Sequence, residues 1–106
     1  MMRRPPLASE GELLKILERL GEPASAEAVW RAARERPNLK TVRAALLRMA
    51  SDSFGWLVET EEAQAGGGWP VPVYALSPRG DGMLRAFLAA EAAQAAPGAV
   101  PSESGA

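Results

Sequence analysis

The stretch that decides the fold is RERPNLKTVRAALLRMA, residues 34–50, because it contains a helix break, a helix start and an apolar stripe in succession. Pro37 lacks the N–H that a continuing helix needs, and it disfavours helical backbone at the residue before it. Asn38 is a favoured residue at a helix N-cap. One apolar helix face then follows, with residues spaced three or four apart at Leu39, Val42, Leu46 and Met49. The stretch therefore predicts a helix over residues 38–50 that begins directly after a turn.

Two further helices are expected before this turn. Ser25 is a favoured N-cap for a helix that runs to about Arg36. Ser9 and Glu12 have the spacing of a capping box at the start of an earlier helix, and Gly21 suits its left-handed C-cap. This earlier helix carries one apolar stripe, at Leu13, Ile16, Leu17 and Leu20. The second and third helices, joined by a short Pro-Asn turn, form the arrangement of a helix-turn-helix.

The periodicity changes after Asp52, where strand-forming residues replace the helical pattern. Residues 56–61 and 71–76 are rich in strand formers and flank a glycine-rich loop, so they predict a β-hairpin. Pro72 cannot donate a hydrogen bond to a neighbouring strand, which gives the second strand a free edge at that point. A turn at residues 78–81 leads into a last helix, whose apolar arc consists of Met83, Leu84, Phe87 and Leu88.

The expected fold class is therefore α+β and mainly helical: a three-helix core, a two-stranded wing and a C-terminal helix. Residues 1–8 are expected to be a flexible N-terminus, residues 9–93 the domain, and residues 94–106 a disordered tail that is poor in large apolar residues. Trp30 and Trp56 are expected in or beside the core. The central core residues are expected to be Leu13, Ile16, Leu17, Leu20, Val29, Val42, Leu46, Met49, Leu57 and Leu76.

Composition excludes several classes of function. The chain of 106 residues is 47% hydrophobic and 24% charged, which is an ordinary mixture for one soluble domain. It has no cysteine and no histidine, so disulfides, thiolate metal sites and imidazole acid–base chemistry are absent. No apolar run is long enough to cross a bilayer, and the basic start is not followed by the apolar segment of a secretory signal. These features predict a cytoplasmic protein without cofactor or metal that is not an enzyme.

Charge is distributed unevenly along the chain, although the net charge is only −1. Residues 31–48 contain six basic residues and one acid, whereas residues 51–78 contain four acids and no base. A basic block followed by an acidic block indicates one surface suited to an anion and another that faces elsewhere. The alternative is that these charges simply solvate helix surfaces. Arg31 fits this alternative, because Glu27 and Glu35 stand four residues away on either side.

Three segments carry a family resemblance: residues 41–49, residues 55–57 and residues 74–80. The first begins with a Thr-Val pair, the second has a glycine that leads into a strand, and the third reads Tyr-x-Leu-Ser-x-x-Gly. Together they resemble bacterial winged-helix regulators of the PadR and MarR type, over roughly residues 9–93. The resemblance implies a dimeric, repressor-like transcription regulator that binds double-stranded DNA and reads the major groove with the helix over residues 38–50.

The residues expected to bind DNA lie on this helix and on the turn before it. Lys40 and Arg43 can reach guanine acceptors or phosphates, and the small Ala44 permits close approach to a thymine methyl group. Asn38 and the first-turn N–H groups are placed for a phosphate, and arginines before the turn add non-specific attraction. The complete set is Arg34, Arg36, Asn38, Lys40, Thr41, Arg43, Ala44 and Arg48.

Two other interpretations of the sequence concern protein contacts. A winged-helix module could bind another protein through its acidic wing, and Trp69 could either pack under the hairpin or present an aromatic surface there. The carboxylates Glu59, Glu61 and Glu62 could suggest catalysis or a cation site, but no histidine accompanies them. The apolar arc Met83, Leu84, Phe87 and Leu88 must fold back on the first helix or meet a partner, and it predicts a homodimer through the last helix.

Overall fold

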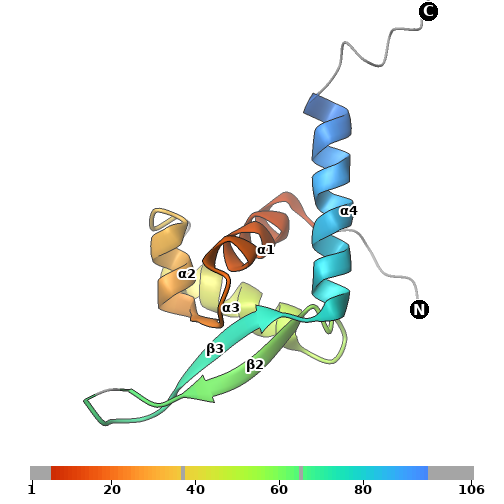
Figure 1. Ribbon diagram of the computed structural model, residues 1–106. Helices are drawn as coiled ribbons and strands as arrows, with labels where there is room; N and C mark the ends of the chain where they lie inside the picture. Colours follow the sequence, from red (N-terminus) through yellow and green to blue (C-terminus); the bar gives the residue numbers. More distant parts are fainter. Residues whose placement is uncertain (1–5, 37, 65, 96–106) are drawn as a thin grey trace, which may run out of the picture.

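The computed structural model describes residues 6–36, 38–64 and 66–95, and within them the chain forms a helical domain with a small sheet (Figure 1). The first three helices pack together, the hairpin extends from one side of them, and the last helix stands across the first. The elements in chain order are α1 (Ala8–Leu20), β1 (Ala24–Ser25), α2 (Ala26–Ala32), α3 (Leu39–Ala50), β2 (Leu57–Glu62), β3 (Val71–Leu76) and α4 (Pro78–Ala95). This confirms the expected α+β class, and the topology is consistent with that of a winged helix.

The sheet has three strands, in the order β1-β3-β2, and not the two that the sequence predicts. The β2–β3 hairpin is antiparallel with Leu57 opposite Leu76 and Glu62 opposite Val71. The additional strand, β1, is only two residues long, and Ala24 pairs with Tyr74 of β3. A two-residue strand has no alternation to detect, and its partner lies far along the chain, so sequence periodicity could not reveal it.

Helix caps explain most of the helix boundaries. The Asn38 side-chain oxygen accepts a hydrogen bond from the Thr41 N–H at 2.8 Å, which confirms the predicted start of α3. Ser25 accepts one from the Ala28 N–H at 3.1 Å at the start of α2. Gly21 ends α1 with a φ of 72°, a left-handed conformation that glycine adopts without strain.

The predicted capping box at Ser9 and Glu12 is wrong by two residues. The residue before α1 is Leu7, and its N–H donates to Glu10 Oε1 at 2.9 Å. The pair Leu7 and Glu10 has the same three-residue spacing as the predicted pair. Glu10 is fully buried, so its carboxylate is turned inward and can close the first turn, whereas Glu12 is exposed on the helix surface.

The second helix ends at Ala32, four residues before the predicted end at Arg36. The reason is a left-handed turn in which Arg34 and Glu35 have φ values of 61° and 59°. The Glu35 N–H donates to the Trp30 carbonyl at 2.8 Å and closes this turn. Left-handed backbone is strained for residues other than glycine. Because no glycine stands just before Pro37, the sequence did not indicate a left-handed turn there. Pro37 itself lies outside the described residues.

One apolar core contains residues from all four helices and from the sheet. Of the predicted core, Leu20 is wrong: it is 38% exposed because it lies in the last turn of α1, beyond the cover of the other helices. Leu76 is half-buried and packs against the core. Trp56 is buried as expected, and Trp30 lies at the margin. The sequence did not indicate the burial of Leu14 and Tyr74, whereas Leu84 was predicted in the apolar arc of the last helix and is fully buried against its own chain.

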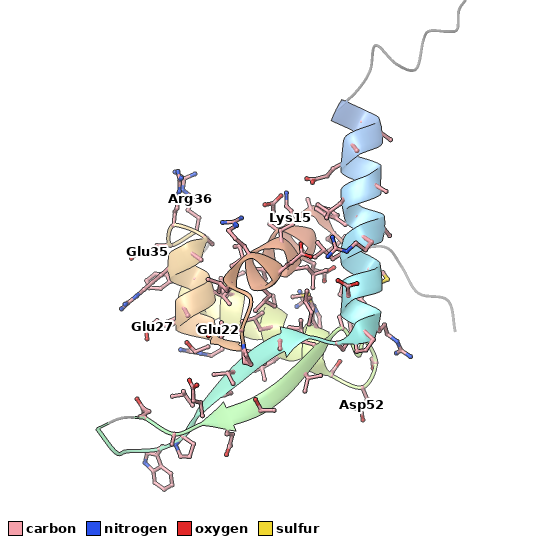
Figure 2. All side chains as sticks on the ribbon, viewed as in Figure 1. Lys15, Glu22, Glu27, Glu35, Arg36 and Asp52 are labelled. Carbon is pink, nitrogen blue, oxygen red and sulfur yellow. The ribbon has the colours of Figure 1, made fainter. Side chains whose placement is uncertain are left out.

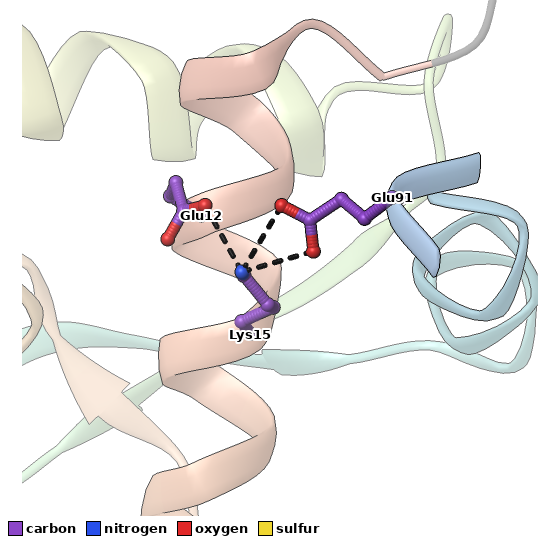
Figure 3. A network of polar contacts seen from close by, with 3 residues as sticks. All are labelled: Glu12, Lys15 and Glu91. Atoms are coloured by element: carbon purple, nitrogen blue, oxygen red, sulfur yellow. Dashed lines mark hydrogen bonds and ion pairs between the residues drawn. The ribbon is translucent and has the colours of Figure 1, made fainter. Parts of the chain in front are cut away.

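Helix α4 folds back on α1, which explains why α1 is buried more broadly than one stripe. The Phe87 ring covers Gly11, where a side chain on α1 would collide with it. The Lys15 ammonium lies 3.0 Å from a carboxylate oxygen of Glu12 and 3.2 Å from one of Glu91, so it ties the two helices together (Figure 3). Glu18 forms an ion pair with Arg85 nearby.

Helix α4 includes residues 94 and 95, which were expected in the tail. Residues 96–106, like residues 1–5, lie outside the described residues.

The junction between β3 and α4 has a fixed set of contacts. The Ser77 hydroxyl donates to the Gly55 carbonyl at 2.6 Å and accepts from the Gly80 N–H at 3.0 Å, so it caps α4 and holds the start of the wing. The Ser77 N–H donates to the Trp56 carbonyl at 3.0 Å. Gly80 rests directly on the Trp56 backbone, and a Cβ at Gly80 would collide with the Trp56 carbonyl oxygen. These contacts give a physical reason for the Ser-x-x-Gly pattern.

We expect Gly80→Ala to lower the free energy of unfolding by about 2–3 kcal/mol, because the added methyl group meets backbone that cannot rotate away. Gly82→Ala is the matched control: it lies two residues later in α4, and its Cβ would meet no atom within 4 Å. This control should raise stability by up to about 1 kcal/mol through helix propensity. Urea unfolding measures both, and equal effects of the two variants would contradict the proposed packing.

Candidate nucleic-acid interface

The predicted DNA-binding residues are all exposed, and they lie in the turn after α2 and on α3, with Arg48 toward α1 and Arg43 toward the sheet. Arg34 and Arg36 are in the turn after α2, and Figure 2 shows Arg36 directed away from the protein at the tip of this turn. Asn38 caps α3, and the remaining residues lie on the exposed side of α3. All eight residues of the predicted set are exposed: Arg34, Arg36, Asn38, Lys40, Thr41, Arg43, Ala44 and Arg48. The buried face of α3 therefore leaves the opposite side of the helix accessible, and the predicted residues on α3 are spread across that side.

The cations of this surface differ in their partners. Arg48 lies 3.4 Å from the buried carboxylate of Glu10 on α1, so part of its charge is already compensated. Arg31 pairs with Glu27 at 2.9 Å, which confirms the expected surface ion pair with that acid. Within the described part of the chain, neither Lys40 nor Arg36 has an ion-pair partner within 4.0 Å, and the same holds for Arg34 and Arg43. Their charges are available to an anion.

Arg43 lies at the side of α3 that faces the sheet. Burial, and then the carboxylate of Glu59, raise the pKa of Tyr74 above its ordinary value of 10.0, while the Arg43 guanidinium acts in the opposite direction. Glu59 is directly opposite Tyr74 in the hairpin register. Arg43 and Glu59 therefore both act electrostatically on this buried tyrosine, although no ion pair joins them.

An apolar groove runs between α1 and α3, beside the exposed cations. Its volume is about 490 Å³. Buried residues of α1 and α3 form its floor, among them Leu13, Ile16 and Val42. The polar rim includes Lys40, Thr41 and Arg48 of α3, and further residues at the rim are Ser9, Glu12 and Arg36. The groove thus shares several residues with the predicted DNA-binding surface.

The wing formed by β2 and β3 is acidic, in contrast to the basic surface of α3. The side chains of Glu59, Glu61 and Glu62 are exposed along β2, and residues 51–78 contain no lysine or arginine. Trp69 is 87% exposed in the loop between the strands, so it does not pack under the hairpin. The Gln64 side-chain amide donates to the Trp69 carbonyl at 2.6 Å and shapes the loop around it. The wing is an acidic surface with one aromatic side chain at its tip.

The four residues predicted to form a dimer interface lie mainly against their own chain. Leu84 is fully buried, and Phe87 covers Gly11 of α1. Met83 and Leu88 are half-buried and pack against the core. The apolar arc thus has an intramolecular partner, and what remains for another molecule is the outer part of α4 beyond α1 (Figure 1).

Two functional candidates escaped the sequence analysis. Leu47 is 49% exposed in the middle of the outward side of α3, where it can contact a ligand of that surface. Its position could have been found from the helical spacing between Lys40, Ala44 and Leu47. Glu10 could not have been found, because its role depends on the burial of its carboxylate against Arg48, which only the packing of α1 on α3 creates.

Comparisons with protein-family models, with curated proteins and with solved structures find no match to this chain. Within the described residues, no cluster of acidic side chains could hold a metal ion. No helix in the described part of the chain is long and apolar enough to cross a membrane.

The electrostatic environment of Tyr74 predicts a pH dependence of stability. A raised pKa in the folded state means that stability is complete below pH 10.0 and is lost as pH rises through the folded pKa, because the unfolded chain loses its phenol proton first. Tyr74 is the only tyrosine of the chain, so tyrosinate absorbance reports this group alone. Urea unfolding across this pH range should show a smaller loss in Tyr74→Phe. Identical pH profiles of the parent and the variant would show that Tyr74 has an ordinary pKa.

Proposed function

We propose that this protein binds double-stranded DNA sequence-specifically and acts as a dimeric, repressor-like transcription regulator. The observation that carries the proposal is the exposed surface of α3 and its preceding turn, where Lys40, Arg43 and Arg36 have no acidic partner within the described residues. An α-helix fits the major groove of B-DNA, and a surface without local counter-charges gains most from phosphates. The winged-helix topology is compatible with this mode of binding but does not by itself require it.

The residues of this surface divide by the contact they can make. Lys40 and Arg43 are the candidates for guanine edges, since both project from the first half of α3. Arg34 and Arg36 are candidates for phosphates because they lie in the turn before the helix. Ala44 leaves room for close approach, and Leu47 can contact a thymine methyl group. Arg48, already paired with Glu10, contributes less net charge.

The acidic wing limits how the DNA can lie. Carboxylates of Glu59, Glu61 and Glu62 repel phosphates, so the wing cannot grip the backbone as a basic wing would. In the proposed complex the duplex contacts α3 and the turn after α2, and the wing is directed away from it. DNA affinity then depends on few cations, and it is expected to be modest.

Lys40→Ala and Arg43→Ala should each weaken duplex binding by about 1–3 kcal/mol and relax the sequence preference. Arg19→Ala is the control, because Arg19 is exposed in the last turn of α1, outside the proposed surface. Fluorescence anisotropy with a duplex selected from random sequences measures the affinities at several salt concentrations. If the Lys40 and Arg43 variants bind as the parent does, α3 is not the reading helix.

The dimer part of the proposal rests on α4. Its last turns extend beyond α1 (Figure 1), and Leu88, three residues before the Glu91 that pairs with Lys15 of α1, is only half-buried. Pairing of two such helices would give a two-fold symmetric protein. Two reading helices could then be placed about one DNA turn, ~34 Å, apart on a palindromic site.

Leu88→Glu should convert a dimer into a monomer, because it places a charge in the proposed contact between α4 helices. Leu88 is a better test than Phe87, whose substitution would also disturb the packing on Gly11. Ala86→Glu is the control, since Ala86 is exposed on the other side of α4. Sedimentation equilibrium at micromolar concentration gives the masses. A monomer mass for the parent, or a dimer mass for Leu88→Glu, would refute the proposal.

A second function is favoured by one observation: Trp69 is 87% exposed beside an acidic strand. Tryptophan is enriched at the energetic centres of protein interfaces. Under this alternative the domain would bind another protein through its wing. Replacing Glu59 and Glu61 by glutamine separates the two functions, because DNA binding should be unchanged or stronger, whereas binding of a basic protein partner should weaken.

A further inference from the structure

We infer that the tip of the wing docks on the exposed side of α3 in a second copy of this chain, so that copies associate through two unlike surfaces. The first surface, the wing tip, consists of three exposed side chains: Glu61, Glu62 and Trp69. The second surface, the α3 patch, consists of four: Lys40, Arg43, Ala44 and Leu47. Each surface combines charge of one sign with an exposed apolar side chain, and the two signs are opposite.

The wing tip is the protruding half of the contact. The far end of the hairpin, where β2 ends and β3 begins, lies away from the helices (Figure 1). Trp69 is 87% exposed there, and the Gln64 amide holds the Trp69 carbonyl at 2.6 Å. Glu61 and Glu62 are the last two residues of β2. Because tryptophan is enriched at the energetic centres of interfaces, the tip can act as an aromatic anchor beside negative charge.

The α3 patch is the receiving half. Lys40 and Arg43 have no ion-pair partner within 4.0 Å among the described residues. Leu47 is 49% exposed and follows Arg43 by four residues, which is about 6 Å along the helix axis. Ala44, between them in sequence, carries only a methyl group and leaves room for a large ring. The patch therefore combines two cations with an apolar surface one helical turn away.

The spacing of charge and apolar side chain is similar on the two surfaces. Trp69 is two residues from Val71, which pairs with Glu62, so it lies at most about 7 Å along the chain from this pair. This distance is close to the separation of Arg43 from Leu47. A carboxylate of the tip can therefore meet a cation of α3 while the indole covers Leu47.

The two surfaces do not satisfy each other within one chain. Among the described residues no ion pair joins the wing to α3. The strands of the wing are paired from Leu57 to Glu62, and this pairing directs the tip away from the helices (Figure 1). A second copy supplies the missing partner of both surfaces. The contact is separate from the proposed pairing of α4 helices.

Sedimentation equilibrium of the full chain without DNA tests the contact first. We expect the weight-average mass to rise with protein concentration at about 20 mM salt and to fall again at about 500 mM, because salt screens exposed ion pairs. Pairing through α4 is apolar, so salt does not lower the mass that it contributes. A mass that is independent of salt would overturn the inference.

Charge reversal identifies the two surfaces. The wing variant is Glu61→Lys with Glu62→Lys, and the α3 variant is Lys40→Glu with Arg43→Glu. Each alone should weaken the salt-dependent association about tenfold or more, because its two surfaces then carry like charge. An equal mixture should restore it to within about threefold of the parent, since each wing tip now meets an α3 patch of opposite charge. A mixture that fails to associate would overturn the inference, whereas restored association also shows that both variants are folded.

The control for net charge is Glu22→Lys with Asp52→Lys, two exposed acids outside both surfaces (Figure 2). It changes the net charge as the wing variant does, and it should alter association by less than about twofold. An equal loss in the control and in the wing variant would overturn the inference, because net charge alone would then decide association.

The apolar side chains are tested separately from the charges. Trp69→Ala should weaken association about tenfold, and Leu47→Ala about fivefold. Leu20→Ala is the control for Leu47, because Leu20 is 38% exposed in the last turn of α1, outside both surfaces. Equal effects of the two leucine variants, or no effect of Trp69→Ala, would overturn the proposed docking.

The effect on DNA rests on the proposed function, because the wing tip and the duplex would occupy the same residues of α3. The α3 variant keeps its wing tip but lacks the cations proposed for DNA, so in excess it should release the parent protein from a labelled duplex. The same variant with Trp69→Ala added should be about tenfold less effective. Equal release by both would refute competition between the wing tip and DNA. If the parent binds no duplex, the proposed function fails, while the masses measured without DNA still decide whether the wing tip docks on α3.

Discussion

The structure depends on how α4 begins. Gly80 has no side chain, and its backbone lies directly on the backbone of Trp56, while the Ser77 hydroxyl links the Gly55 carbonyl to the first turn of α4. These contacts fix the angle at which the chain leaves the sheet. Because α4 is a single helix of 18 residues, this angle also determines where Phe87 and Glu91 arrive on α1. A change at the junction would therefore be transmitted to the far side of the domain.

Helix α1 lies between α4 and α3, and this position explains its burial. Gly11 and Lys15 face α4, whereas Leu13 and Ile16 face α3. Glu10 belongs to both environments, since it closes the first turn of α1 and pairs with Arg48 of α3. A fully buried carboxylate is costly unless charges and donors surround it. The contacts that satisfy Glu10 thus also link the first turn of α1 to α3.

Local signals in the sequence predicted local structure well. Asn38, Ser25 and Gly21 fix the helix boundaries that they predicted, because each acts through backbone groups within a few residues. The predictions failed where distant parts of the chain decide. The pairing of Ala24 with Tyr74 depends on contact between segments far apart in sequence, and the burial of Leu14 and the exposure of Leu20 depend on which parts of α1 other elements cover.

The candidate site likewise has some features that local sequence predicts and others that depend on the packing of distant segments. The exposed set on α3 follows from helical spacing and could be predicted, since a helix has one buried side and one accessible side. The pairing of Arg48 with Glu10 and the groove beside Lys40 could not, because both require α1 to be placed against α3. The left-handed turn at Arg34 and Glu35 was missed for a different reason, since these residues are uncommon in that conformation and give no signal of it.

The separation of charge between α3 and the wing has a consequence for encounters with any polyanion. The protein carries a net charge of only −1. Its electric field therefore arises mainly from the separation of positive from negative charge and only slightly from the net charge. Ions screen its field beyond ~8 Å at physiological salt, and at larger separations a polyanion is neither attracted nor repelled appreciably. At shorter range the two ends experience opposite forces, which exert a torque on the protein. The molecule therefore turns its basic end toward a polyanion only at short range, and added salt weakens this orientation.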